Sequence, residues 1–148
     1  MTPSAPAPAD VVVHTDGGAR GNPGPAGIGV VVTDRSGQVL AEIAEGIGHA
    51  TNNVAEYRAV IAGLERAREL GAVRVRVRAD SLLVVSQLAG TWKVKDAGLR
   101  PLWARARELA REFERVTFEH VRRERNRAAD ALANRAMDAQ ARAASGEV

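Results

Sequence analysis

The change in spacing of apolar residues along the chain constrains the fold most. Five stretches have apolar residues that are contiguous or alternate with polar ones, which is typical of β-strands. These stretches are 11–13, 28–33, 39–47, 73–80 and 116–121. Helical spacing occurs over 53–70, 81–88, 98–113 and 126–142. The order β-β-β-α-β-α-α-β-α predicts an α/β domain.

The 148-residue chain is long enough for one domain with its own core. Its opening residues, MTPSAPAPA, are rich in proline and alanine, and its last residues are small or polar. We therefore expect a flexible arm over 1–9, a folded domain over 10–142 and a flexible tail over 143–148.

Composition excludes several classes of protein. The chain has no cysteine, so it has neither disulfides nor thiolate metal sites, and any metal must be bound by oxygen or histidine. No apolar stretch approaches the roughly 20 residues that cross a bilayer, and no signal peptide is visible, so we expect a cytoplasmic protein without a membrane partner. The formal charge of +3 permits a polyanionic partner without requiring one.

Four acidic residues occupy equivalent places in this order of elements. Asp16 ends the first strand and Asp80 ends the fourth, while Glu56 and Asp130 lie in the first turns of two helices. If the first three strands form a meander, the first, fourth and fifth strands are parallel. All four acids are then expected at one edge of the sheet, where α/β folds bind their ligands.

Four neighbouring carboxylates repel one another unless cations neutralise them. Hard oxygen ligands favour Mg²⁺ or Mn²⁺. Two such ions about 3.5–4 Å apart can stabilise both the entering and the leaving oxygen of a phosphodiester. The sequence therefore predicts phosphodiester hydrolysis at this edge.

Each acid also has a simpler interpretation. Asp16 could shape a turn, and Glu56 could form a capping box with Asn53. Asp80 could belong to a helix cap, and Asp130 could be a favourable charge near a helix N-terminus. Taken together, four acids at one edge favour a functional site over coincidence.

The segment HTDGGARGNPGPAG, residues 14–27, raises a separate question. It lacks the G-K-[ST] ending of a phosphate-binding loop and leads into a strand, which argues against a nucleotide cradle. Glycines at 17, 18 and 21 would let the main chain approach a ribose 2′-OH. The alternative is a flexible hairpin loop.

Four motifs in order resemble ribonuclease HI over about residues 10–141: TDGGARGNPGPAGIGVVV, TNNVAEYRAVIAGL, RADSLLVVSQL and RNRAADALANRA. The resemblance implies a monomeric enzyme that cuts the RNA strand of RNA/DNA hybrids and leaves 5′-phosphate and 3′-hydroxyl ends. It implies two Mg²⁺ ions, or Mn²⁺, as cofactor. It also implies a five-stranded mixed sheet of order 3-2-1-4-5, with strand 2 antiparallel and helices on both faces.

The resemblance assigns roles to individual residues. Asp16, Glu56, Asp80 and Asp130 match the catalytic, metal-binding carboxylates. Trp92 matches an aromatic residue that lies against the DNA backbone, although a core tryptophan is the alternative. The residues expected to contact the hybrid are Gly18, Ala19, Gly21, Asn22, His49, Thr51, Asn52, Asn53, Trp92 and Lys95.

The chain departs from the family in two places. The short link from His120 to Asn126 lacks the histidine-bearing loop that many members carry before the last acid. Without that histidine, we expect slow turnover or a preference for manganese. We expect His120 to support the end of the fifth strand, and Arg123 and Asn126 to be auxiliary residues. The connector AGTWKVKDAGLRP carries few basic residues, so hybrid affinity should be low and salt-dependent.

Three further possibilities follow from the same motifs. The fold could serve as a nucleic-acid-binding module without catalysis, or as another nuclease of the same superfamily. Short variants of this kind also resemble the N-terminal half of two-domain proteins that append a phosphatase-like domain.

Overall fold

The sheet has the strand order that the sequence predicted. The computed structural model describes residues 8–146, so most of the expected N-terminal arm and the last two residues of the expected tail lie outside it. The strand order is β3-β2-β1-β4-β5, with β2 antiparallel to its neighbours and β4 and β5 parallel to β1. The strands are β1 (Asp10–Ala19), β2 (Gly24–Asp34), β3 (Val39–Ala50), β4 (Arg74–Ala79) and β5 (Arg115–His120).

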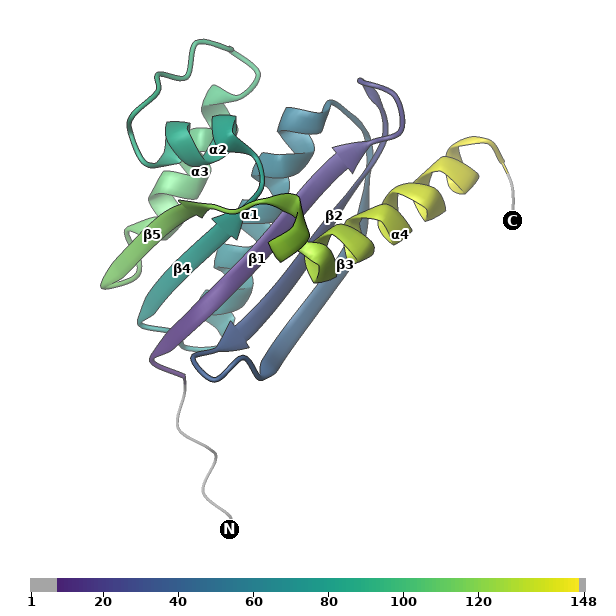
Figure 1. Ribbon diagram of the computed structural model, residues 1–148. Coiled ribbons are helices and arrows are strands. Elements are labelled where there is room, and N and C mark those ends of the chain that lie inside the picture. The colour runs from purple at the N-terminus through teal and green to yellow at the C-terminus, as the bar shows by residue number, and fades with distance from the viewer. Residues whose placement is uncertain (1–7, 147–148) are drawn as a thin grey trace.

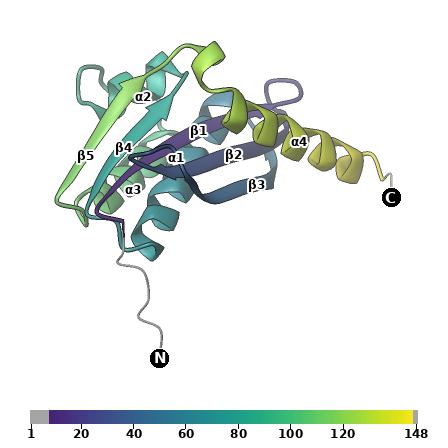
Figure 2. The same ribbon diagram turned by 60° about the horizontal axis from the view of Figure 1, so that its bottom comes forward.

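Helices cover both faces of the sheet, as expected (Figures 1 and 2). Three of them lie on one face: α1 (Asn52–Glu69), α2 (Leu82–Leu88) and α3 (Arg100–Ala110). A short 3₁₀ turn, η1 (Arg123–Arg125), leads into α4 (Arg127–Ala144), which lies on the other face. None of the helices in the described part of the chain is long and apolar enough to span a membrane.

Helix α4 packs on β2 through glycines. A Cβ at Gly27 would lie 2.6 Å from the backbone nitrogen of Met137, and one at Gly29 would overlap the carbonyl of Ala129. The helix can approach this closely only because both strand residues lack side chains. The contacts place α4 over β1, β2 and β3, and leave part of that face open along β4 and β5.

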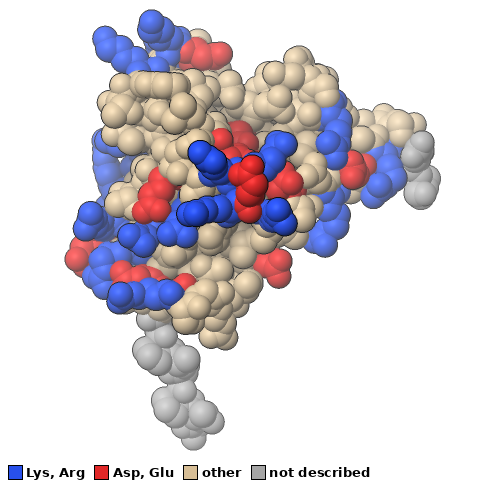
Figure 3. Space-filling view, in the orientation of Figure 1, with Lys and Arg blue, Asp and Glu red and all other residues tan. Residues whose placement is uncertain are grey.

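The core lies between the sheet and the three-helix layer. Val75 and Val77 of β4 are buried there, while the alternating Arg74, Arg76 and Arg78 lie on the open face. Figure 3 shows basic and acidic side chains intermingled on that face. The contiguous apolar run over 11–13 is typical of a strand buried on both faces, but Val12 lies towards the open face and is only half-buried.

The first strand is longer than the sequence indicated. We expected Asp16 to end it, but β1 continues to Ala19 and Asp16 pairs with Gly29 of β2. The parallel partner β4 stops earlier, with Ala79 opposite Thr15. Asp16 therefore lies where β1 is still paired with β2 but no longer with β4. Consecutive glycines usually mark a turn, but here Gly17 and Gly18 remain in the ladder because helices pack against them.

Candidate active site

Three of the expected carboxylates converge at one edge of the sheet. Asp16, Glu56 and Asp80 each offer an oxygen atom, and these atoms lie within 4.8 Å of one another. The cause is topological, because parallel β1 and β4 point the same way and α1 begins at the edge where they end. Asp16 and Glu56 are buried, with 5% and 8% of their surface exposed.

Asp130 lies near this cluster but is not one of the three residues that share the 4.8 Å spacing. It occupies the first turn of α4, where its backbone N–H donates to the carbonyl oxygen of Asn126 at 3.0 Å. The Asp130 carboxylate helps to raise the pKa values of Asp16 and Asp80. The fourth acid therefore disfavours charge on two of the other three, Asp16 and Asp80.

Burial and mutual repulsion disfavour charge on these acids. Burial, followed by the neighbouring Asp130 and Asp80, raises the pKa of Asp16 to about 7. Burial and the Asp16 and Asp80 charges raise the pKa of Glu56 well above its ordinary value. The pKa of Asp80 is also raised, mainly by burial, while the charge of Arg123 opposes the rise.

Only one carboxylate oxygen of Glu56 has a hydrogen-bond partner in the described portion of the protein. Its Oε1 accepts a hydrogen bond from the backbone N–H of Gly17 at 3.4 Å, and its Oε2 is buried without a partner. No ion pair involves Asp16 or Glu56 among the residues the structure describes. Such all-oxygen donors without a cation fit a hard divalent ion, which would supply the missing positive charge.

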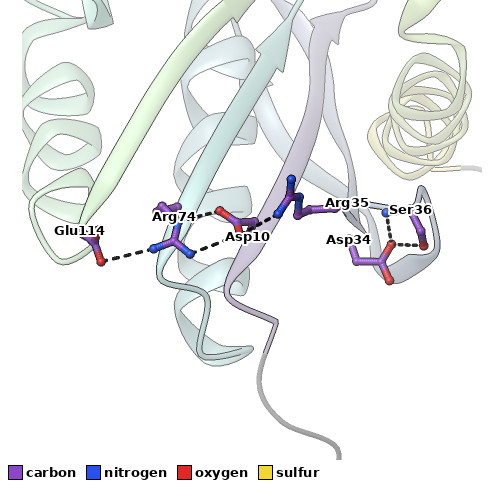
Figure 4. Close-up of polar contacts among 6 residues, drawn as sticks. All are labelled: Asp10, Asp34, Arg35, Ser36, Arg74 and Glu114. Atoms are coloured by element: carbon purple, nitrogen blue, oxygen red, sulfur yellow. Dashed lines mark hydrogen bonds and ion pairs between the residues drawn. The ribbon is translucent and has the colours of Figure 1, made fainter.

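A second acid on β1, Asp10, is paired with an arginine and has a lowered pKa (Figure 4). Asp10 lies six residues from Asp16 and points to the same face of the sheet. Arg74 Nε donates to its Oδ1 at 2.7 Å, and this hydrogen bond is the main reason that the pKa of Asp10 is lowered. An arginine therefore neutralises the acid at the start of β1, whereas no side chain in the described part of the chain does so for Asp16.

The link between β5 and α4 supports Asp80. His120 Nε2 lies 3.2 Å from the Asp80 carbonyl oxygen, consistent with the expected role of His120 at the strand end. Arg123 Nε lies 3.9 Å from Asp80 Oδ2 on a largely exposed side chain. The guanidinium of Arg123 thus lies at the rim of the cluster.

Asn126 connects the two elements that carry Asp16 and Asp130. Its side chain is 2% exposed, and its Nδ2 donates to the Thr15 carbonyl oxygen at 2.8 Å. Its own carbonyl oxygen accepts the N–H of Asp130. Asn126 therefore fixes the start of α4 against β1, next to the cluster.

The helix caps decide two alternatives left open by the sequence. Thr51, not Asn53, caps α1, because its Oγ1 accepts from the Val54 N–H at 3.2 Å. Glu56 instead turns towards Gly17. Ser81 caps α2 in the same way, which leaves the Asp80 side chain outside the cap.

The glycine-rich hairpin is anchored by hydrogen bonds, which argues against the alternative of a flexible loop. Asn52 Oδ1 accepts from the Ala19 N–H at 2.8 Å, and Asn22 Oδ1 accepts from the Asn52 N–H at 3.0 Å. Arg20 Nη2 donates to Asp138 on α4 at 2.8 Å. The hairpin is therefore connected to both α1 and α4, and Gly21 supplies a positive φ of 87° at its tip.

A cleft of about 500 Å³ adjoins the cluster, and its lining includes Asn52, Asn53, Glu56, Asp80 and Arg123. His49 is exposed on β3, close in sequence to this region. Trp92 is 47% exposed, so the interpretation as a core tryptophan is wrong. Trp92 and Lys95 lie on the connector between α2 and α3, and Lys95 is also exposed.

Sequence reasoning missed several residues that position these elements. Arg20 anchors the hairpin, and Gln87 is buried beneath the connector. No local pattern marks either of them, because Asp138, the partner of Arg20, is 118 residues away and Tyr57, one partner of Gln87, is 30 residues away. Only the tertiary contacts show their roles.

Fold and site together define an α/β domain of the ribonuclease H type, with an acidic cluster suited to divalent ions. The sequence matches the family described as "Reverse transcriptase-like" over residues 14–136. The bifunctional protein Rv2228c of Mycobacterium tuberculosis is 54% identical over 138 residues, which cover 93% of this chain and 38% of that protein. Ribonuclease HI of Halobacterium salinarum is 48% identical over 128 residues, covering 86% of this chain and 64% of that protein.

Solved structures agree with these relatives. The N-terminal ribonuclease H domain of the mycobacterial protein matches with a TM-score of 0.90, covering 92% of this chain and 99% of that one at 54% identity. LC11-RNase H1 from compost, solved with an RNA/DNA hybrid, matches with a TM-score of 0.83, covering 87% of this chain and 97% of that one at 46% identity. The chain therefore belongs to the reverse transcriptase-like family and, within it, to the ribonuclease HI group. It spans only 38% of the length of its mycobacterial relative.

Proposed function

We propose that this chain is an endoribonuclease that hydrolyses the RNA strand of RNA/DNA hybrids and leaves 5′-phosphate and 3′-hydroxyl ends. The observation that carries the proposal is the cluster of Asp16, Glu56 and Asp80, whose carboxylates lie together. Among the described residues, its one ion pair is between Asp80 and the largely exposed Arg123, at 3.9 Å. The relative solved with an RNA/DNA hybrid supports this choice of substrate.

Asp16, Glu56, Asp80 and Asp130 would bind two Mg²⁺ or Mn²⁺ ions. Divalent ions at such a site supply Lewis-acid chemistry for in-line hydrolysis of a phosphodiester. Asp16 is held in the β1–β2 ladder and Glu56 is fixed by the Gly17 N–H, so both carboxylates are positioned before substrate arrives. Asn126 holds α4, and with it Asp130, against the same edge.

Most of the proposed substrate-binding residues belong to the hairpin and to the start of α1. Asn22 and Asn52 connect the hairpin to the start of α1, which places Gly18, Ala19, Gly21, Thr51 and Asn53 in one region. The backbone and amide groups of this region would contact the minor groove and the RNA 2′-hydroxyls. Trp92 and Lys95, exposed on the connector, would contact the DNA backbone.

Metal-dependent cleavage of a labelled RNA/DNA hybrid tests the proposal directly. Asp16→Asn should lower the rate at least about 100-fold, since metal-ion charge stabilisation supplies several kcal/mol. Asp10→Asn is a matched control, because Asp10 lies on the same strand and face but is paired with Arg74. Equal rates for wild type and Asp16→Asn would reject the assignment.

Substrate comparison separates this activity from that of related nucleases. Hybrid, duplex DNA and duplex RNA differ in their 2′-hydroxyls and groove shape, so only the hybrid should be cut. Binding of the hybrid without metal-dependent cleavage would instead identify a binding module.

The setting of the domain belongs to the same proposal. We expect a monomer in the cytoplasm, and in the whole protein a phosphatase-like domain joined to this one. The relative described as bifunctional, of which the chain covers 38%, supports the last point. Sedimentation analysis checks the monomer, and a phosphatase assay on the full-length protein checks the second domain.

A further inference from the structure

The connector between α2 and α3 has turns but no helix or strand of its own. Two residues of α2 anchor its first half. Ser86 accepts at its carbonyl oxygen from the N–H groups of Thr91 and Trp92, at 3.0 and 3.1 Å. Gln87 Nε2 donates to the Lys93 carbonyl oxygen at 3.4 Å. The backbone around Trp92 is therefore held from α2.

Tyr57 of α1 orients the second of these anchors. Its hydroxyl donates to Gln87 Oε1 at 2.6 Å, and both side chains are buried. Because Oε1 is occupied by this hydrogen bond, the amide nitrogen of Gln87 is directed to Lys93. Burial raises the pKa of Tyr57 to about 12, so the hydroxyl keeps its proton at any working pH.

Tyr57 is also the neighbour of Glu56 in the chain. Two hydrogen bonds thus connect the helix that carries a cluster carboxylate to the loop that carries Trp92. We infer that Tyr57 and Gln87 are positioning residues. They hold the connector that carries Trp92 at a fixed position relative to the carboxylate cluster, so that one hybrid contacts both. The hybrid in this inference is that of the proposed function, whereas the positioning of the connector does not depend on it.

The exposure of Trp92 explains why such an anchor is needed. Almost half of the side chain is solvent-exposed, so core packing does not fix its position. A small displacement of a group that positions the substrate strongly lowers the reaction rate or the affinity. Hydrogen bonds from α2 to the backbone at Thr91, Trp92 and Lys93 instead hold this part of the connector.

The lysines of the chain provide a readout that does not depend on activity. Lys93 and Lys95 are its only lysines and both lie in the connector, so a lysine-specific protease cuts the native protein only there. Tyr57→Phe keeps the ring and removes the hydrogen bond to Gln87. Cleavage at the two lysines should become about threefold to tenfold faster. The rate follows the fraction of molecules in which the connector is locally detached, and the loss of one hydrogen bond raises that fraction by this factor.

Val32→Ala is the control for general destabilisation. Val32 is fully buried on β2, away from the connector, and its truncation leaves a cavity. At temperatures where the two variants are equally stable, Tyr57→Phe should be cut faster than Val32→Ala. Equal cleavage of the two variants, or cleavage of Tyr57→Phe at the wild-type rate, would overturn the inference. Gln87→Leu must behave like Tyr57→Phe, and the double variant must show less than the sum of the two effects.

Kinetics on the hybrid give a second test. Tyr57→Phe should raise KM about threefold with unchanged kcat, because it loosens binding and leaves the cluster intact. In a Trp92→Ala background the same change should have no further effect on KM. A fall in kcat, or a KM effect that persists without Trp92, would contradict the inference. If the wild type cuts no hybrid, the proposed function fails, and the protease assay still decides whether Tyr57 positions the connector.

Discussion

Gly17 of β1 lies directly against the carbonyl group of Ala55 in α1, and a Cβ at Gly17 would overlap that group. The contact brings the first turns of α1 onto the strand. It also places Glu56, the next residue of the helix, within hydrogen-bond distance of the Gly17 N–H. The distance between Asp16 and Glu56 therefore depends on the absence of a side chain at position 17.

Gly17→Ala should consequently damage both stability and activity. Overpacking at a backbone contact costs about 1–3 kcal/mol of unfolding free energy, and α1 must move away from β1. Hybrid cleavage should fall more than tenfold, because Glu56 moves with the helix. Urea denaturation and initial rates measure the two effects. Gly18→Ala should be milder in stability, since it faces the flexible Met137 side chain. Wild-type stability in Gly17→Ala would show that the contact is not restrictive.

The metal-free protein should lose stability as the pH rises. The folded pKa of Asp16, about 7, lies above its ordinary value of 3.8. Its contribution is therefore fully present below about pH 4 and is lost as the pH rises through 7, by up to about 4 kcal/mol. Glu56, with its pKa also raised, acts in the same direction. Thermal unfolding from pH 4 to pH 8 in EDTA measures this loss.

Two comparisons make that prediction specific. Asp16→Asn should be more stable than the wild type at pH 8 in EDTA, because it removes a buried charge. Added Mn²⁺ should stabilise the wild type at pH 8 far more than Asp16→Asn, since the ion binds only the folded cluster. A metal-free wild type whose stability increases from pH 5 to pH 8 would contradict the raised pKa values.

Asn126→Ala should uncouple α4 from β1. The substitution leaves the buried Thr15 carbonyl oxygen without its donor, which costs about 1–3 kcal/mol of unfolding free energy. Because α4 carries Asp130, affinity for Mn²⁺ should fall as well. Calorimetric titration with Mn²⁺ and urea denaturation measure the two effects. Asn134→Ala, which removes hydrogen bonds to the Asp130 carbonyl oxygen and to Arg20 but leaves the bond from Asn126 to Thr15, serves as the control. Unchanged Mn²⁺ affinity in Asn126→Ala would limit this residue to a structural role.

Trp92→Ala should weaken hybrid binding without affecting the fold. Since the side chain is half-exposed, its removal should change the unfolding free energy by less than about 0.5 kcal/mol. The Kd for the hybrid should rise about tenfold, as for an aromatic interface anchor. Fluorescence anisotropy with labelled hybrid measures it. Val39→Ala removes an equally exposed apolar side chain at the start of β3 and should leave the Kd unchanged. Equal affinities of Trp92→Ala and wild type would place the hybrid elsewhere.

The sequence by itself determined the order of elements and the edge at which the acids gather, whereas the strand order was implied by the resemblance to ribonuclease HI. The first two follow from local period and chain direction: once β1 and β4 are parallel, Asp16 and Asp80 must lie at the same edge. The four motifs likewise gave the family, because their order leaves little room for coincidence.

Only the tertiary structure decided what the glycines, caps and buried amides do. The sequence predicts that Gly17 is a turn residue, but in the fold it is a packing contact with α1. The sequence predicts only that Asn126 begins a helix, whereas its side chain also holds that helix to β1. Gln87 lies in an apolar helical stretch, and its partners come from α1 and the connector. Local patterns record a residue's neighbours along the chain, whereas these roles arise from contacts between segments that only folding brings together.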